Sequence, residues 1–238
     1  MTEAALERPT DLLGLLEARA PLEGLGLLAA WPYLAVMPRG DGRPVVLAPG
    51  YGAGDAAMYP LFRYLEWLGY DMHHWGLGRN RGNVGESIRK LTSRVSYLKA
   101  SRDGARVTLI GWSLGGVIMR EIAREQPKLV REVITLGTPI VGGPKYTRVA
   151  KVFAGRHNID LDHLEQEIHR RNQRPITCPL TSVYSKSDGI VAWRASIDSY
   201  NPQARNVQVA SSHLGMVFNP LVWRVIARTL GENHPRRG

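Results

Sequence analysis

The stretch that most constrains the fold is an apolar run that stops at a glycine and continues, after a serine, as a helix-like run. Residues 107–120 read VTLIGWSLGGVIMR. The β-branched and apolar residues at its start are typical of a buried strand, and Gly111, Ser113 and Gly115 follow as Gly-x-Ser-x-Gly. Because glycine has no Cβ, a strand and a helix can approach closely on either side of the serine. The pattern therefore predicts a strand, a sharp turn with Ser113 at its tip, and a helix.

Further short apolar segments alternate with helix-like segments, which is typical of a parallel α/β sheet. The expected strands are 45–48, 70–75, 107–110, 132–136, 181–184 and 206–209. The expected helices are 56–68, with Asp55 as its N-cap, 84–100, the helix after Ser113, and 220–230. We therefore predict an α/β fold with a mostly parallel central sheet that is flanked by helices.

The sheet pattern is confined to one part of the chain. We expect residues 44–230 to form a single α/β domain, preceded by a helical segment over 1–43 and followed by a flexible tail over 231–238. The segment 1–43 contains two leucine-rich pieces separated by Pro21 and glycines. We expect it to pack on the body of the domain; the alternative is that it contacts a lipid surface.

Residues 140–175 interrupt the alternation of strands and helices. The insertion opens with Gly142-Gly143-Pro144, and Asp160–Arg171 has the pattern of a mostly polar helix. An insertion at this point is predicted to be a lid or a wall of a pocket that excludes water. The alternative is a surface excursion without a function.

Composition excludes several classes of protein. The chain of 238 residues has a formal net charge of +10, but its Lys and Arg residues are scattered, so we expect a solvated basic surface and no nucleic-acid partner. The single cysteine, Cys178, precludes an intrachain disulfide and is expected to be a small buried hydrophobe. The first residues include Glu3 and Glu7 and lack the basic region and apolar core of a signal peptide. No stretch is apolar enough to span a membrane, so the expected location is cytoplasmic. The sequence does not indicate the oligomeric state.

Two further residues are candidates for chemistry with Ser113. A serine hydroxyl needs a neighbouring base to act as a nucleophile, and Asp188 and His213 each stand just past the end of a different expected strand. In a parallel sheet those ends lie at one edge, so the three side chains can meet there. His213 would accept the hydroxyl proton, and Asp188 would orient and stabilise the imidazole.

Other acidic and histidine residues fit this role less well. The acidic alternatives lie in the insertion or in an expected helix, and the histidines lie in the insertion, in the tail or within a strand. They are Asp160, Asp162, Asp198, His157, His163, His169, His234 and the strand residues His73 and His74, which we interpret as structural. We predict neither a metal site nor a cofactor.

A serine site of this kind also needs N–H donors for the negative oxygen of its tetrahedral intermediate. Leu114 is the residue after the serine, and Tyr51 follows Pro49-Gly50 in a glycine-rich loop at the end of the strand 45–48. The backbone N–H groups of Leu114 and Tyr51 are therefore the predicted oxyanion hole.

Three motifs resemble those of the α/β-hydrolase superfamily, in particular its bacterial esterase- and lipase-like members. They are Gly111-Trp112-Ser113-Leu114-Gly115-Gly116, Ser187-Asp188-Gly189-Ile190-Val191 and Ser211-Ser212-His213. The resemblance covers about residues 44–230. It implies the α/β-hydrolase fold and hydrolysis of carboxylic esters through an acyl-serine, without a cofactor, on a small-molecule or lipid-like substrate.

The chain departs from the family pattern at one point, because Pro49-Gly50-Tyr51 stands where many lipases have His-Gly. No strand is visible before residue 44, so the sheet is expected to be shorter than the full family plan. Two other functions remain open at this stage. They are acyl transfer by the same three residues, and a non-catalytic binding protein on a hydrolase scaffold.

Overall fold

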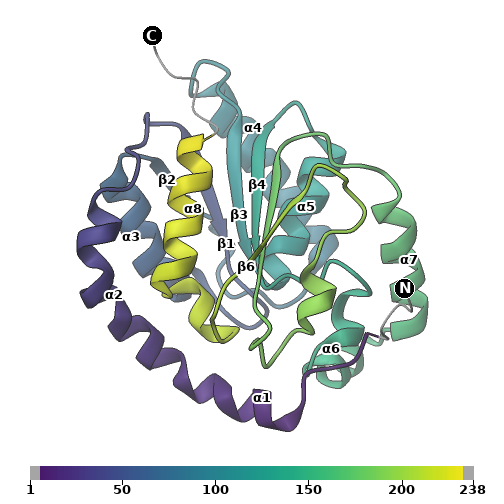
Figure 1. The fold of residues 1–238 in the computed structure, drawn as a ribbon. Helices are drawn as coiled ribbons and strands as arrows, with labels where there is room; N and C mark the ends of the chain where they lie inside the picture. The colour runs from purple at the N-terminus through teal and green to yellow at the C-terminus, as the bar shows by residue number, and fades with distance from the viewer. Residues whose placement is uncertain (1–5, 233–238) are drawn as a thin grey trace.

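The computed structural model describes residues 6–232 and contains a central sheet of six strands, all parallel (Figure 1). The strands are β1 (Pro44–Ala48), β2 (Asp71–His74), β3 (Val107–Trp112), β4 (Val130–Leu136), β5 (Leu180–Tyr184) and β6 (Arg205–Gln208). Their order in the sheet is β2-β1-β3-β4-β5-β6. The predicted α/β class with a parallel sheet is confirmed, and β1 and β3–β6 all end at the same edge.

Helices cover both faces of this sheet (Figure 1). α3 (Tyr59–Leu68) and α8 (Pro220–Glu232) pack on one face, and α4 (Val84–Ala100) and α5 (Leu114–Glu125) on the other. Alternate residues of β1 belong to the two resulting cores, Val45 and Leu47 to one and Val46 and Ala48 to the other. Burial on both faces explains why the strands are continuous apolar runs.

The N-terminal segment forms α1 (Asp11–Leu15), the 3₁₀ helix η1 (Leu16–Arg19) and α2 (Ala20–Ala35). The prediction that Pro21 and glycines separate the leucine-rich pieces is wrong. Pro21 lies in the first turn of α2, where a missing N–H costs nothing, and the helix continues through the following glycines. α2 packs against α8. No helix of the described part of the chain is long and apolar enough to cross a bilayer.

The insertion contains η3 (Gly143–Tyr146), α6 (Ala150–His157) and α7 (Leu161–Asn172). α7 agrees with the helix expected over 160–171, whereas α6 was not predicted. Cys178 is buried as expected, and burial raises the pKa of its thiol to about 11.

Three local predictions are wrong. Asp55 does not cap a helix: it begins the 3₁₀ helix η2 (Asp55–Met58), and its carboxylate lies 3.7 Å from His74 Nδ1. Asp198 lies in a loop and not in a helix, because its carboxylate forms a buried ion pair with Arg120. Residues 231 and 232 are the end of α8 and not a tail; the remaining tail, 233–238, lies outside the described residues.

Candidate active site

Ser113 stands between β3 and α5 in a backbone conformation that L-residues rarely adopt. Its φ and ψ are 55° and −122°. The Ser113 N–H donates to the carbonyl of Leu136 at 2.8 Å, and the hydroxyl of Thr138 donates to the carbonyl of Ser113 at 3.0 Å. Such strain persists only where surrounding contacts enforce it, and it occurs mainly at functional sites. The hydroxyl is thereby held at the end of the strand.

The glycines around Ser113 are required by the closeness of the backbone. A Cβ added to Gly111 would lie 2.4 Å from the Cα of Gly116, and one added to Gly115 would lie 2.3 Å from the carbonyl oxygen of Ala48. Both distances are far below a carbon contact. The structure therefore has the close approach of strand and helix for which the sequence argument required glycine.

Asp188 and His213 lie at the same edge of the sheet, after β5 and β6, and are almost completely buried. His213 Nδ1 is 2.7 Å from Asp188 Oδ2. The second oxygen, Oδ1, accepts the N–H groups of Ile190 and Val191 at 2.9 and 2.7 Å, so the carboxylate cannot rotate freely. The turn of residues 187–191, the acid turn, thus directs one carboxylate oxygen at Nδ1 of the imidazole. This orientation leaves Nε2 available as a base.

The same edge brings His213 close to the serine turn. The indole Nε1 of Trp112 donates to the carbonyl of His213 at 3.1 Å, and a Cβ added to Gly137 would lie 2.9 Å from His213 Nδ1. No hydrogen bond joins the Ser113 hydroxyl to the imidazole within the described residues. Bonds between a nucleophile and its base often tighten only when substrate binds.

The electrostatic environment of His213 favours its charged form. Burial lowers the pKa of the imidazole, but the charge and hydrogen bond of Asp188 and the charge of Glu17 outweigh burial and raise it above the usual value. An imidazolium is the species produced when His213 removes a proton from a hydroxyl. The pair is therefore suited to accept that proton.

The predicted N–H donors both border Ser113. Leu114 is the first residue of α5, where an N–H has no acceptor within the helix. The Tyr51 N–H donates to no acceptor among the described residues. A Cβ added to Gly50 would lie only 3.1 Å from the Ser113 Cβ, so the loop that carries Tyr51 lies against the serine.

Two residues that hold these loops in place, Asn80 and Glu17, were not predicted from the sequence. Asn80 is fully buried, and its side chain donates to the carbonyl of Pro49 and accepts the N–H of Gly82. Glu17 accepts backbone N–H groups beside Asp188 and His213. A signal for Glu17 was present, since it and Glu23 are the only acidic residues between positions 12 and 40.

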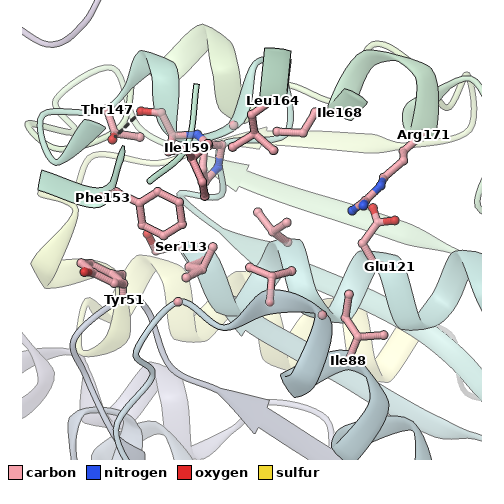
Figure 2. A pocket seen from close by; sticks show the side chains of 18 of the residues that line it. Tyr51, Ile88, Ser113, Glu121, Thr147, Phe153, Ile159, Leu164, Ile168 and Arg171 are labelled. Carbon is pink, nitrogen blue, oxygen red and sulfur yellow. Dashed lines mark hydrogen bonds between the residues drawn. The ribbon is translucent and has the colours of Figure 1, made fainter. Parts of the chain in front are cut away.

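A cavity of about 540 Å³ opens above Ser113 (Figure 2). Its walls come from α4, α5 and the insertion, and Phe153 and Tyr51 lie beside the serine while Glu121 and Arg171 face each other at the far end (Figure 2). The apolar lining includes Ile88, Leu114, Val117, Phe153, Ile159, Leu164 and Ile168. A volume of this size with a largely apolar wall suits a small organic molecule. Asp188 and His213 are buried beside the cavity and do not line it.

The other candidates from the sequence have structural partners elsewhere. They act as a helix cap, in ion pairs or as packed rings: Asp160 caps α7 and accepts the backbone N–H of His163, Asp162 pairs with Lys145, Asp198 with Arg120 and His73 with Asp71, while His74 stacks on Phe62, His157 packs at a tilt on Phe153, and His169 contacts Tyr200. His234 lies outside the described residues. Residues 6–232 contain no cluster of His, Cys, Asp and Glu that fits a metal ion.

Solved structures provide the comparison. A lipase from Bacillus licheniformis superposes with a TM-score of 0.63 at 15% identity, covering 82% of this chain and 94% of that one. An esterase from Pyrococcus furiosus superposes with a TM-score of 0.57 at 18% identity, covering 81% of this chain and 83% of that one. A monoacylglycerol lipase from Paleococcus ferrophilus superposes with a TM-score of 0.57 at 16% identity, covering 83% of this chain and 97% of that one. No protein family and no curated protein matches the sequence.

These neighbours share a parallel sheet with flanking helices. The chain therefore has the α/β-hydrolase fold, as the resemblance in its motifs implied.

Proposed function

We propose that this chain is a serine hydrolase that cleaves carboxylic esters through an acyl-serine intermediate. The observation that carries the proposal is the position of Ser113. It stands in a strained turn at an apolar cavity, and a buried Asp188–His213 pair lies at the same edge of the sheet. The names of the structural neighbours, which include lipases and esterases, agree with this chemistry.

The proposed reaction uses five residues. Ser113 Oγ attacks the ester carbonyl while His213 accepts the hydroxyl proton, and Asp188 stabilises the imidazolium. The N–H groups of Leu114 and Tyr51 hold the negative oxygen of the tetrahedral intermediate. The C–O bond to the alcohol then breaks, and His213 returns the proton to the departing alkoxide. Water attacks the acyl-serine by the same route and releases the carboxylic acid.

The substrate is proposed to be an ester with an apolar acyl group, because apolar side chains surround the serine. Val117 follows Ser113 by one turn of α5 and lines the cavity. Val117→Trp should reduce kcat/KM for a p-nitrophenyl octanoate at least tenfold and for the acetate by much less, since the indole fills space that only a long chain needs. Val152→Trp, at an exposed site of α6, is the matched control. Equal losses for both esters would contradict this assignment of the acyl site.

Acyl transfer and ligand binding without catalysis are the competing functions. Product analysis with an added acceptor alcohol distinguishes acyl transfer from hydrolysis, because transfer yields a new ester and hydrolysis yields the free acid. We expect the free acid as the main product. A new ester as the main product would indicate a transferase, and the absence of any turnover would favour a binding protein.

We also propose that the outward face of α1 and α2 contacts an anionic lipid surface. This face exposes large apolar side chains: Leu12, Leu15, Leu16, Leu22, Leu25, Leu28, Trp31, Tyr33 and Val36. Of the three carboxylates between residues 11 and 36, those of Glu17 and Glu23 point inward to the loop of His213, and that of Asp11, at the start of α1, pairs with Arg148. At the end of the face, the Arg39 guanidinium lies 4.0 Å from the ring of Trp67. Exposed apolar residues with Trp, Tyr and Arg, and with few exposed acids, are typical of interfacial helices.

Sedimentation with vesicles tests this contact. The protein should bind phosphatidylglycerol vesicles, and Leu25→Asp with Leu28→Asp should reduce the bound fraction severalfold, whereas Val152→Asp on α6 should not. Equal binding by all three proteins would contradict the proposal. So would a dimer in solution that the same double variant dissociates, since the face would then bind a second copy.

A further inference from the structure

The carboxylate of Glu17 lies between the two loops that carry Asp188 and His213. Glu17 belongs to η1, far away in the sequence, and is only 6% exposed. Its Oε1 accepts the N–H groups of Gly189 at 2.7 Å and His213 at 2.8 Å. Its Oε2 accepts the N–H of Leu214 at 2.8 Å. One side chain therefore connects the acid turn to the histidine loop.

The surroundings leave the Glu17 carboxylate without a counter-ion. It forms no ion pair with any residue of the described range 6–232. The nearest arginine of its own segment, Arg19, pairs with Glu23 and donates to the carbonyl of Ser187. The carboxylates of Asp188 and Glu17 thus both contact His213, the first at its imidazole and the second at its backbone N–H, and no Lys or Arg of the described range pairs with either of them. Burial of such a group is costly unless hydrogen bonds compensate for it.

The packing around the acid turn shows that this contact is built closely. A Cβ added to Gly189 would lie 2.1 Å from the carbonyl oxygen of Leu13. The same Cβ would lie 3.0 Å from the Cγ of Glu17, so only glycine allows the turn to approach α1 and η1 closely enough for its N–H to reach Glu17. β5 and β6 themselves end before Asp188 and His213, so loop contacts of this kind set the distance between the two side chains.

We propose that Glu17 is a positioning residue for His213, a role that rests on the proposed ester hydrolysis. It fixes the backbone of His213 relative to Asp188, and it supplies a second negative charge that stabilises the imidazolium formed during each proton transfer. Among the described residues, the charges that raise the pKa of His213 are those of Asp188 and Glu17.

The experiment compares Glu17→Gln with a matched control, Glu23→Gln. Glu23 also holds the histidine loop, since it accepts the hydroxyl of Ser211 and the N–H of Ser212. It holds Ser211 and Ser212, whereas Glu17 accepts the N–H of His213 itself, and the charge of Glu17 raises the pKa of the imidazole. Both variants remove one carboxylate that holds this loop, but only Glu17→Gln removes the one bonded to His213.

We expect Glu17→Gln to lower kcat/KM about tenfold and to move the acid limb of its pH profile to lower pH. The direction follows because a negative charge raises the pKa of an imidazole, so its removal lowers that pKa. Glu23→Gln should lower the Tm but leave the acid limb in place. An unchanged acid limb in Glu17→Gln, or the same shift in both variants, would overturn the proposal.

Two further measurements keep the test decisive. NMR titration of His213 should show the lower pKa in Glu17→Gln whether or not a good ester substrate is found, so failure of the proposed function and failure of this inference are distinguishable. If Glu17→Gln does not fold, Glu17→Asp takes its place in the test, because its shorter side chain keeps the charge but cannot reach both loops. We expect Glu17→Asp to have a lower kcat and an unchanged acid limb of its pH profile. A wild-type kcat in this variant would contradict the positioning role.

Discussion

Ser113→Ala will reduce kcat for a p-nitrophenyl ester by about 10⁵- to 10⁶-fold, close to the background rate. The loss is this large because the hydroxyl is the atom that forms the covalent bond, and the cavity and N–H donors alone supply only a small residual acceleration. The fold should survive, since the hydrogen bonds of the turn are made by the backbone of Ser113 and by Thr138. Steady-state kinetics and circular dichroism measure the two parts of this expectation.

The matched control is Ser93→Ala on α4, where an exposed hydroxyl bonds only to the carbonyl of Arg89. It should retain wild-type kcat. If Ser113→Ala kept more than about one per cent of the activity while folded, another group would be the nucleophile and the proposed mechanism would be wrong.

Asp188→Asn is expected to have the second largest effect, a loss of about 10⁴-fold in kcat. The amide oxygen can keep the two N–H groups of Ile190 and Val191, which places the NH₂ group opposite His213 Nδ1. The imidazole must then carry its proton on Nε2, where it cannot accept one from Ser113. Loss of the carboxylate charge also lowers the pKa of His213, so the residual activity should extend to lower pH.

Asp160→Asn provides the comparison for Asp188→Asn. Asp160 caps α7 at the surface, and asparagine is an equally good cap, so kcat and Tm should both stay near wild type. A similar small effect at Asp188, with the protein folded, would remove Asp188 from the proposed mechanism.

Local patterns were enough to predict the sheet and the serine turn. The apolar run before Gly111 predicted a strand, which the structure buries on both faces, and the glycines around Ser113 indicated a close approach that the structure contains. Asp188 and His213 were predicted to meet because both follow apolar strands and the ends of parallel strands share one edge, and the structure pairs the two side chains there. These inferences need only neighbouring residues and the general geometry of a parallel sheet.

Contacts between distant segments could not be predicted in this way. Glu17 bonds to His213 across 196 positions, and no local pattern specifies such a pair. Asp198 was expected in a helix, but the buried ion pair with Arg120 holds it in a loop. α6 was missed because its pattern is weak and its burial depends on Ala150 and Phe153 packing within the insertion.

The central claim is that Ser113 is an activated nucleophile, and labelling with a fluorophosphonate followed by peptide mass spectrometry tests it most directly. The reagent phosphonylates a serine only where a neighbouring base and N–H donors activate it. We predict one adduct, on the peptide that contains Ser113, with none in Ser113→Ala and much slower labelling in His213→Ala. Absence of an adduct in the folded wild-type protein, or an adduct on a different serine, would contradict the account.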